Sequence, residues 1–212
     1  MFWDRVAFVY DIFANGINKK ANRALCAAVE KLIAPDDEVL ECACGTGLLT
    51  SVIAPRCKSL VATDFSAKML ERAARKCRKY GNVRFAPADI LQLAYPDAHF
   101  DLVVAANVIH LLDEPMQALH ELDRVRRPGG RLIIPTYMNR TDKGRTNGVS
   151  DMIGKAGADF KREFTLDTYR RFFADAGYTE MPITSFATAG FPARWRCSES
   201  VERYESDNIA GR

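Results

Sequence analysis

The stretch that decides the fold is VLECACGTG, at residues 39–47. Its first half is short and apolar, and small residues follow at once, which predicts a buried strand, a glycine turn and then a helix. Small residues at the carboxyl end of a strand let a ligand lie against the main-chain N–H groups of the next helix. The stretch therefore indicates a nucleotide-type pocket. It lacks the dinucleotide fingerprint GxGxxG, because Leu48, Leu49 and Thr50 follow Gly47.

Strands and helices alternate on both sides of this stretch. Apolar runs bounded by turn residues predict strands, and apolar residues spaced three and four apart predict amphipathic helices. The run FDLVVAANVIHLL (100–112) is apolar almost throughout, which is typical of a central parallel strand covered on both faces. The expected strands are 38–43, 58–63, 82–87, 100–112, 131–137, 179–187 and 193–197, and the main expected helices are 21–32, 66–77, 114–125 and 165–176.

This alternation predicts the fold class. Strands that alternate with helices of this length imply right-handed crossovers and hence a parallel sheet between two layers of helices. We therefore expect an α/β protein with a doubly wound, mostly parallel, seven-stranded sheet. The last two strands, joined by the short turn TAGFP (188–192), are expected to form an antiparallel C-terminal hairpin at one edge of that sheet.

The composition excludes several classes of protein. With 48% hydrophobic and 27% charged residues, the chain resembles ordinary globular proteins rather than disordered or disulfide-rich ones. A net charge of +3 is too small to indicate nucleic acid, and no apolar run reaches the length of about 20 residues that a membrane-spanning helix needs. The six cysteines show no CxxC spacing, so we expect mostly free thiols, no metal site and a reducing cytoplasm.

Acidic residues follow the next two expected strands. Asp64 ends the second strand, where a carboxylate can accept hydrogen bonds from both ribose hydroxyls of an adenosine. Asp89 follows the third strand, where an acid can receive the adenine amino group while Ile90 or Phe65 packs on the ring. Because the carboxyl ends of parallel strands meet at one edge, the two acids and the glycine turn are expected to line one crevice.

With these residues the sequence resembles the class I S-adenosylmethionine-dependent methyltransferases. The resemblance spans about residues 1 to 196 and is carried by VLECACGTG, VATDFS (61–66), APADILQLAYPDAHFDLVVAANVIHLL (86–112) and RRPGGRLII (126–134). The opening WDRVAFVYDIF (3–13) is similar to the aromatic and acidic first helix of the ubiquinone and menaquinone biosynthesis methyltransferases. Ala43 stands where the family commonly has glycine, a change that is also usual in this quinone-related group.

The resemblance implies S-adenosyl-L-methionine as the cofactor and S-adenosyl-L-homocysteine as its product. It implies that the cofactor lies across the carboxyl ends of the strands, with each part held by residues that match the family's motifs. It implies that Gly45, Gly47 and the backbone around Ala43 bind the methionine part and that Asp64 binds the ribose. It further implies that the adenine contacts Phe65, Asp89 and Ile90, that Asn107 lies beside the sulfonium, and that Tyr10 covers the outer side of the cofactor.

A catalytic base is optional in this chemistry. Methyl transfer from a sulfonium is an in-line displacement with an activated leaving group, so the protein mainly aligns the reactants and excludes water. Where the acceptor must lose a proton, His110 is the candidate base. The alternative for His110 is a helix-start residue packed on the sheet, and the alternative for Tyr10 is a plain core contact.

We expect one domain, as the length of 212 residues suggests. Its expected parts are an N-terminal helical lid (1–34), a cofactor-binding core (35–137), a cap loop (138–164), a last helix with the hairpin (165–198) and a polar tail (199–212).

The expected activity is methyl transfer to a small molecule, with the acceptor open between a quinone-like carbon, a lipid amine and another N, O or S nucleophile. One alternative is a sensor or partner subunit that binds the cofactor or its product without transferring methyl. A nicotinamide-dependent oxidoreductase is disfavoured, because the sequence lacks both the glycine fingerprint and a Tyr-x-x-x-Lys set. Methylation of RNA or protein is disfavoured because the chain shows no added recognition domain.

Overall fold

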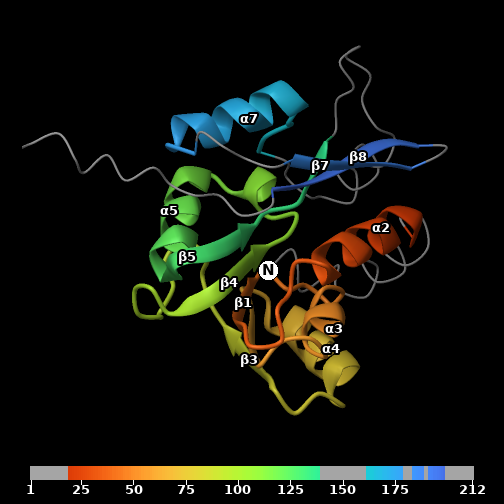
Figure 1. The fold of residues 1–212 in the computed structure, drawn as a ribbon, viewed down its shortest axis with the longest axis vertical. Coiled ribbons are helices and arrows are strands. Elements are labelled where there is room, and N and C mark those ends of the chain that lie inside the picture. Colours follow the sequence, from red (N-terminus) through yellow and green to blue (C-terminus); the bar gives the residue numbers. More distant parts are fainter. Residues whose placement is uncertain (1–18, 139–160, 179–182, 189–190, 199–212) are drawn as a thin grey trace, which may run out of the picture.

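A parallel sheet forms the centre of the molecule (Figure 1). The computed structural model describes residues 19–138, 161–178, 183–188 and 191–198. The sheet has five strands in the order β3-β2-β1-β4-β5, all paired in parallel. Its strands are β1 (Glu38–Cys42), β2 (Ser59–Asp64), β3 (Val83–Pro87), β4 (Phe100–Ala105) and β5 (Arg126–Ile133). The strand order reverses between β1 and β4, which is where doubly wound sheets bind their ligands.

Helices cover both faces of this sheet, as the doubly wound prediction requires (Figure 1). Helices α2, α3 and α4 contribute to the apolar cluster on one face, and α5 and α7 contribute to the cluster on the other. The bounds are α2 (Lys19–Glu30), α3 (Thr50–Ile53), α4 (Ala67–Cys77), α5 (Pro115–Val125), α7 (Leu166–Asp175) and the short 3₁₀ helix η1 (Ile109–Leu111).

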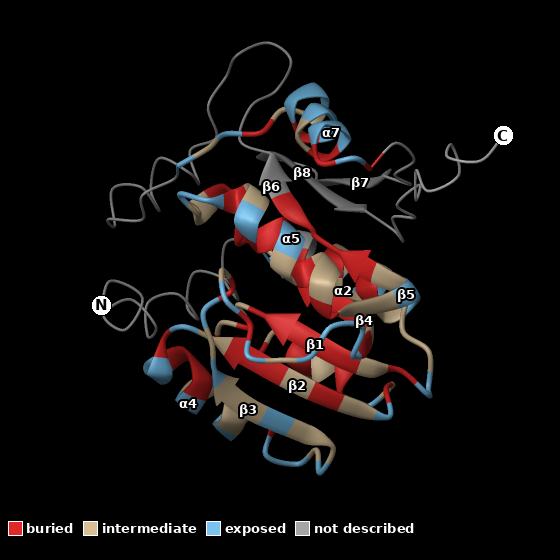
Figure 2. Cartoon of the chain, turned by 90° about the vertical axis from the view of Figure 1, so that its left-hand side faces the viewer, coloured by how far each residue is buried: buried red, intermediate tan, exposed pale blue. Residues whose placement is uncertain are grey.

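The central strands are buried on both faces (Figure 2). Successive side chains of a strand point to opposite faces, so an almost wholly apolar strand must be covered twice. Leu40 and Val103 face the α5 side, whereas Val39, Leu102 and Val104 face the side of α2, α3 and α4. This alternation explains why the sequence shows apolar runs here rather than a polar and apolar repeat.

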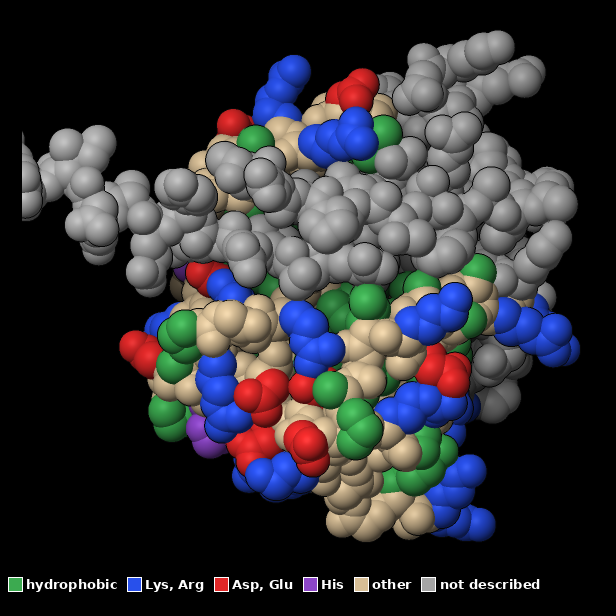
Figure 3. Space-filling model, viewed as in Figure 1, with side chains coloured by type: hydrophobic (Ala, Val, Ile, Leu, Met, Phe, Trp, Pro, Cys, Tyr) green, Lys and Arg blue, Asp and Glu red, His purple; other side chains and the backbone are tan. Residues whose placement is uncertain are grey.

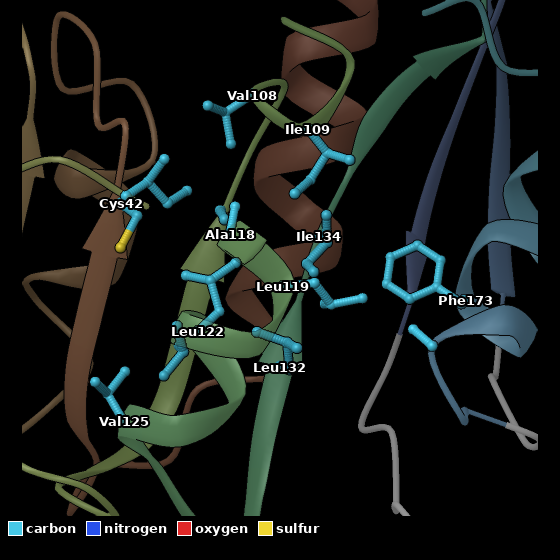
Figure 4. Packing of buried hydrophobic residues seen from close by; sticks show 14 of the residues in the cluster. Cys42, Val108, Ile109, Ala118, Leu119, Leu122, Val125, Leu132, Ile134 and Phe173 are labelled. Atoms are coloured by element: carbon cyan, nitrogen blue, oxygen red, sulfur yellow. The ribbon is translucent and has the colours of Figure 1, made fainter. Parts of the chain in front are cut away.

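The core on the α5 side is built from side chains far apart in the sequence (Figure 4). Leu119 and Leu122 of α5 pack with Leu132 and Ile134 from β5 and the residue after it, and Phe173 of α7 joins the same cluster. All of these side chains are fully buried. Burial of such a side chain contributes about 1.5 to 3 kcal/mol, so this contact fixes both helices on the sheet.

The expected single seven-stranded sheet is wrong. A separate three-stranded sheet in the order β6-β8-β7 follows the parallel one. It consists of β6 (Thr136–Met138), β7 (Ile183–Thr188) and β8 (Phe191–Ser198), and β8 runs antiparallel to both neighbours. The segment 131–137, expected as one strand, therefore serves both sheets, because β5 ends at Ile133 and the chain passes through Pro135 before β6 begins.

Two other expected elements differ in extent. The helix after the glycine turn is only four residues long. The Ala54 amide donates its last hydrogen bond, to the Thr50 carbonyl, and the next residue, Pro55, has no N–H to continue the ladder. The expected strand 100–112 stops at Ala105, because Asn107 has φ 55° and turns the chain out of the sheet. Its amide N–H donates to the Pro135 carbonyl at 2.8 Å, which fixes this turn at the sheet's carboxyl edge.

Side-chain hydrogen bonds cap the first turns of α4 and α7. The Ser66 hydroxyl accepts a hydrogen bond from the Met69 amide and opens α4. Thr165 and Thr168 form a reciprocal capping box that opens α7, and Gly177, with φ 88°, follows its end. Such caps contribute about 1 kcal/mol each and set where the helices begin.

Ion pairs tie the strands together at the amino-terminal edge of the sheet. Arg127 donates to Asp101 Oδ1 at 2.6 Å and to Glu38 Oε2 at 2.8 Å, so it links β5 to β4 and β1. Lys58 donates to the other Glu38 oxygen at 2.8 Å. Acidic and basic side chains are also interspersed over the described part of the surface in Figure 3, in keeping with the small net charge.

Several predicted segments fall partly or wholly outside the described residues. They include Tyr10 and the first part of the lid, most of the cap loop and the polar tail. Among the residues that are described, no helix is both long and apolar enough to cross a membrane. The same residues contain no cluster of three or more His, Cys, Asp or Glu side chains suited to a metal ion.

Gly47→Ala is expected to lower the free energy of unfolding by about 2 to 4 kcal/mol, measured by urea denaturation. Gly47 has φ 81°, and a Cβ there would lie 3.1 Å from the backbone and side chain of Ala73 in α4. The matched control is Gly129→Ala. Gly129 has φ 73° but open space around it, so backbone strain alone should lower the free energy of unfolding by about 1 to 2 kcal/mol. Equal losses in the two variants would show that contact with α4 contributes nothing.

Candidate functional site

A cavity of about 310 Å³ opens at the carboxyl edge of the parallel sheet, next to the ends of β1, β2, β3 and β4. Seven of the ten sequence-predicted site residues line it, and they come from separate strand ends. These seven are Ala43, Gly45, Asp64, Phe65, Asp89, Ile90 and Asn107. The sequence reasoning missed the small and apolar residues of the wall, which are Met69, Ala88, Ala106, Val108, Leu111 and Leu112.

The glycine turn after β1 forms one wall of the cavity. Ala43 and Gly45 both have left-handed backbone, with φ 54° and 55°, and alanine pays for this conformation in strain. The Cys44 amide donates to the Thr63 carbonyl at 2.8 Å, so the turn continues the pairing between β1 and β2. A Cβ added to Gly45 would have no atom within 4 Å, so the space beside this residue is open. The turn is therefore open on its ligand side.

Asp64 connects this turn to the next crossover. One carboxylate oxygen accepts from the Gly45 amide at 2.8 Å, and the other accepts from the Ser66 amide at 2.9 Å. Each oxygen of a carboxylate can accept about two hydrogen bonds, so one backbone amide does not exhaust it. The carboxylate lines the cavity with its orientation already fixed by the backbone.

The three residues assigned to the adenine by the resemblance, Phe65, Asp89 and Ile90, line the cavity with two apolar side chains and one carboxyl group. Phe65 is 60% exposed and is the large hydrophobic side chain left uncovered among the described residues. Ile90, which also lines the cavity, is buried. Asp89 is exposed, and its Oδ1 accepts a hydrogen bond from the Leu91 amide at 2.9 Å. An exposed ring beside a cavity is a surface that a flat apolar ligand can cover.

Asn107 lies on the cavity wall where the chain leaves the sheet after β4. Its side-chain Oδ1 is buried without a hydrogen-bond partner among the described residues. An unsatisfied buried acceptor costs about 1 to 3 kcal/mol, and a left-handed non-glycine residue adds strain. Both costs gather at the position that the resemblance assigns to the sulfonium.

Two predicted site residues do not line the cavity. Gly47 faces Ala73 of α4, so the structure gives it a packing role, and its contact with a cofactor stays a prediction. His110 is 4% exposed, and its Nδ1 lies 2.9 Å from the Thr136 hydroxyl oxygen. Burial lowers the pKa of His110 to about 4, which keeps its ring neutral at physiological pH. Its role as a base also stays a prediction, and this geometry favours the packing alternative.

Glu41 is a residue that the sequence reasoning passed over. It lies in β1, is 2% exposed, and accepts a hydrogen bond of 2.6 Å from the Thr50 hydroxyl. Burial is the main cause that raises the pKa of Glu41 to about 8, and the nearby charge of Asp64 raises it further. The sequence did carry a sign of it, because an acid inside the apolar run VLECA must be buried with a partner.

Comparison with known proteins identifies the family of this chain. A family model described as a methyltransferase domain matches residues 40–134. The demethylmenaquinone methyltransferase of Clavibacter sepedonicus is 32% identical over 134 residues, which are 62% of this chain and 55% of that protein. The phosphatidylethanolamine N-methyltransferase of Cereibacter sphaeroides is 31% identical over 150 residues, which are 69% of this chain and 71% of that protein. The chain belongs to the class I S-adenosylmethionine-dependent methyltransferases.

Solved structures show that this family member has the family's fold. A methyltransferase from Thermotoga maritima superimposes with a TM-score of 0.71 at 18% identity, covering 94% of this chain and 98% of that one. At such low identity the likeness concerns the fold alone. The match covers only about half the length of the Clavibacter relative.

The residues of this methyltransferase fit the family's cofactor, S-adenosylmethionine. Asp64 offers two preoriented acceptor oxygens for hydroxyl groups, and the open turn at Gly45 lets a ligand approach the backbone. The uncovered ring of Phe65 offers a surface for a flat base. The fit thus rests on a carboxylate, an open turn and an exposed ring that meet at one cavity.

Glu41→Gln is expected to change how stability depends on pH. A carboxyl whose pKa is about 8 when folded and near 4.5 when unfolded stabilises the fold below pH 4.5, and this stabilisation is lost as pH rises toward 8. Glutamine can still accept from Thr50 but does not ionise. The free energy of unfolding of the variant, relative to the wild type, should therefore rise by about 3 kcal/mol between pH 5 and pH 8.

Urea denaturation at several pH values measures this difference. The exposed Glu71→Gln in α4 serves as the control and should follow the wild type. A constant difference between Glu41→Gln and the wild type across this range would show that Glu41 ionises normally.

Proposed function

We propose that this protein transfers the methyl group of S-adenosylmethionine to a small-molecule acceptor. The observation that carries the proposal is the convergence of Gly45, Asp64, Asp89 and Asn107 on one cavity at the point where the strand order reverses. Each of these residues alone is commonplace. Together they supply an open backbone, two carboxylates and an amide to one ligand, which is the arrangement that an adenosine with a polar amino-acid tail requires.

The cofactor supplies an activated methyl group, and the chain supplies binding, orientation and exclusion of water. In the proposed pose Asp64 accepts from the ribose hydroxyls, while Phe65 and Ile90 enclose the base. The backbone at Ala43 and Gly45 faces the amino-acid part. An in-line displacement needs little more from the protein than alignment in a dry site.

The acceptor proposed here brings its own nucleophile. Among the described residues that line the cavity, Asp64 and Asp89 are the ionisable ones, and both are assigned to the cofactor. The wall beyond Asn107 is apolar and consists of Val108, Leu111 and Leu112. An acceptor with an apolar body and an amine, or with an ionised quinol ring, fits such a wall. The named relatives act on acceptors of these kinds, a demethylmenaquinone and a phosphatidylethanolamine.

The proposed compartment remains the reducing cytoplasm. Cys42, Cys44, Cys57 and Cys77 are buried free thiols, as the sequence predicted, and burial raises the pKa of each. Raised pKa values keep these thiols protonated and unreactive. The cysteines are therefore core residues in this proposal, and nucleic acid has no part in it.

The purified protein is expected to bind S-adenosylhomocysteine and not NADH, because the cavity has an open glycine turn and a ribose-facing acid without the dinucleotide fingerprint. Isothermal titration calorimetry measures both ligands. Transfer of labelled methyl from S-adenosylmethionine to a demethylmenaquinol or to phosphatidylethanolamine then tests catalysis. Binding without transfer to either acceptor would favour the sensor or partner subunit, and NADH binding alone would falsify the family function.

Asp64→Ala is expected to weaken binding of S-adenosylhomocysteine by about 2 to 3 kcal/mol, or about 30- to 150-fold. The reason is the loss of a carboxylate that accepts charge-assisted hydrogen bonds from two hydroxyls. Asp36→Ala removes an exposed acid outside the cavity wall and provides the control. Unchanged affinity in a folded Asp64→Ala variant would show that the ribose is held elsewhere.

A further inference from the structure

One face of α5 holds the loop between β3 and β4, which carries part of the cavity wall. Gln117, Glu121 and Arg124 lie three and four residues apart, so they share one side of the helix. All three make hydrogen bonds to the loop segment 91–97. Asp89 and Ile90, which line the cavity, stand at the start of this loop.

Arg124 makes most of these contacts. Its guanidinium donates to the carbonyls of Leu93 and Tyr95, each at 2.8 Å, and to Asp97 Oδ1 at 2.7 Å. It also donates to both carboxylate oxygens of Glu121, at 2.8 and 2.9 Å. The planar fork of an arginine suits several acceptors held in one plane, and a lysine cannot reproduce it.

Glu121 and Gln117 complete the attachment. Glu121 Oε2 accepts from the Leu93 amide at 2.8 Å, so both backbone groups of Leu93 are bound to α5 side chains. Gln117 donates to the Leu91 carbonyl at 3.0 Å. Apart from a single bridge between Asp89 and Gln92, this loop lacks sheet pairing, and side chains replace the ladder of hydrogen bonds that a strand would have.

The attached segment is rigidly connected to the cavity wall. The Leu91 amide donates to Asp89 Oδ1 at 2.9 Å, and the Gln92 amide donates to the Asp89 carbonyl at 3.1 Å. Ile90 and Leu93 are 9% and 4% exposed and belong to the same buried cluster. A displacement of Leu93 would therefore be passed to Asp89 and Ile90 through a tight turn.

We propose that Arg124 is a positioning residue for the cofactor, acting through the 89–97 loop to hold Asp89 and Ile90 against the adenine. This inference rests on the proposed function, because it takes the cavity to be the cofactor site. Arg124 itself does not line the cavity. Its contribution to binding is the preorganisation of one wall.

Arg127 provides a matched control at the other end of the sheet. Its side chain is 37% exposed against 31% for Arg124, and it also bridges two carboxylates, Glu38 and Asp101. Its partners lie at the amino-terminal edge, where no cavity residue is attached. Loss of either arginine removes a bridging cation, but only Arg124 holds the loop.

The test measures the Kd of S-adenosylhomocysteine for Arg124→Met and Arg127→Met by calorimetry, well below the melting temperature of both variants. Arg124→Met should raise Kd about tenfold, while Arg127→Met should stay within about twofold of the wild type. In a double-mutant cycle, Ile90→Ala should cost less affinity in the Arg124→Met background than in the wild type, because the wall is already misplaced. Gln117→Ala, an exposed change, should raise Kd about threefold and serves where Arg124→Met does not fold.

Equal affinities of the Arg124→Met and Arg127→Met variants, or additive effects in the cycle, would reduce Arg124 to a structural ion pair and overturn the inference. For a non-folding Arg124→Met, unchanged affinity in Gln117→Ala would do the same. A wild type that fails to bind S-adenosylhomocysteine is a different outcome, because it removes the proposed function itself and this inference with it.

Discussion

Burial of β1 and β4 on both faces is the constraint on which the rest of this structure depends. Most of their side chains are apolar on both faces, so helices must cover both sides of the sheet. Crossovers that place helices in this way keep the strands parallel and bring their carboxyl ends to one edge. Polar residues that follow the strands, such as Asp64, Asp89 and Asn107, therefore lie together at this edge. The cavity, its acids and its strained turns follow from this geometry.

Two carboxyl groups near that edge have different surroundings. Asp64 accepts hydrogen bonds from two backbone amides and lines the cavity, whereas Glu41 is buried, and this burial raises its pKa and favours its neutral form. One carboxyl group thus lines the cavity, while the other accepts a buried hydrogen bond from Thr50. The two acids lie on neighbouring strands, Glu41 within β1 and Asp64 at the end of β2, and differ in burial.

Among the described residues, two of the three non-glycine positions with left-handed backbone lie at the same edge. Ala43 and Asn107 both have left-handed φ and both line the cavity, whereas Ala98 lies in the loop before β4. A fold tolerates such positions where the surrounding bonds over-determine them, here through Cys44 to Thr63 and Asn107 to Pro135. The loop that carries Asp89 and Ile90 is likewise held by hydrogen bonds to residues outside the cavity, in this case side chains of α5.

The sequence by itself determined the five strands of the parallel sheet, most helix boundaries and the residues of the cavity that sit directly at strand ends. These features are local, since period, caps and small residues can be read within about ten residues of chain. Only the tertiary structure decided that β6, β7 and β8 leave the main sheet, that Gly47 packs on α4, and that His110 turns toward Thr136. It also decided the role of Glu41 and the attachment of the 89–97 loop by Arg124. Each of these features depends on burial or on a partner that is distant in the sequence. The sequence pattern shows which side chains are apolar, but not which groups they contact in the folded chain.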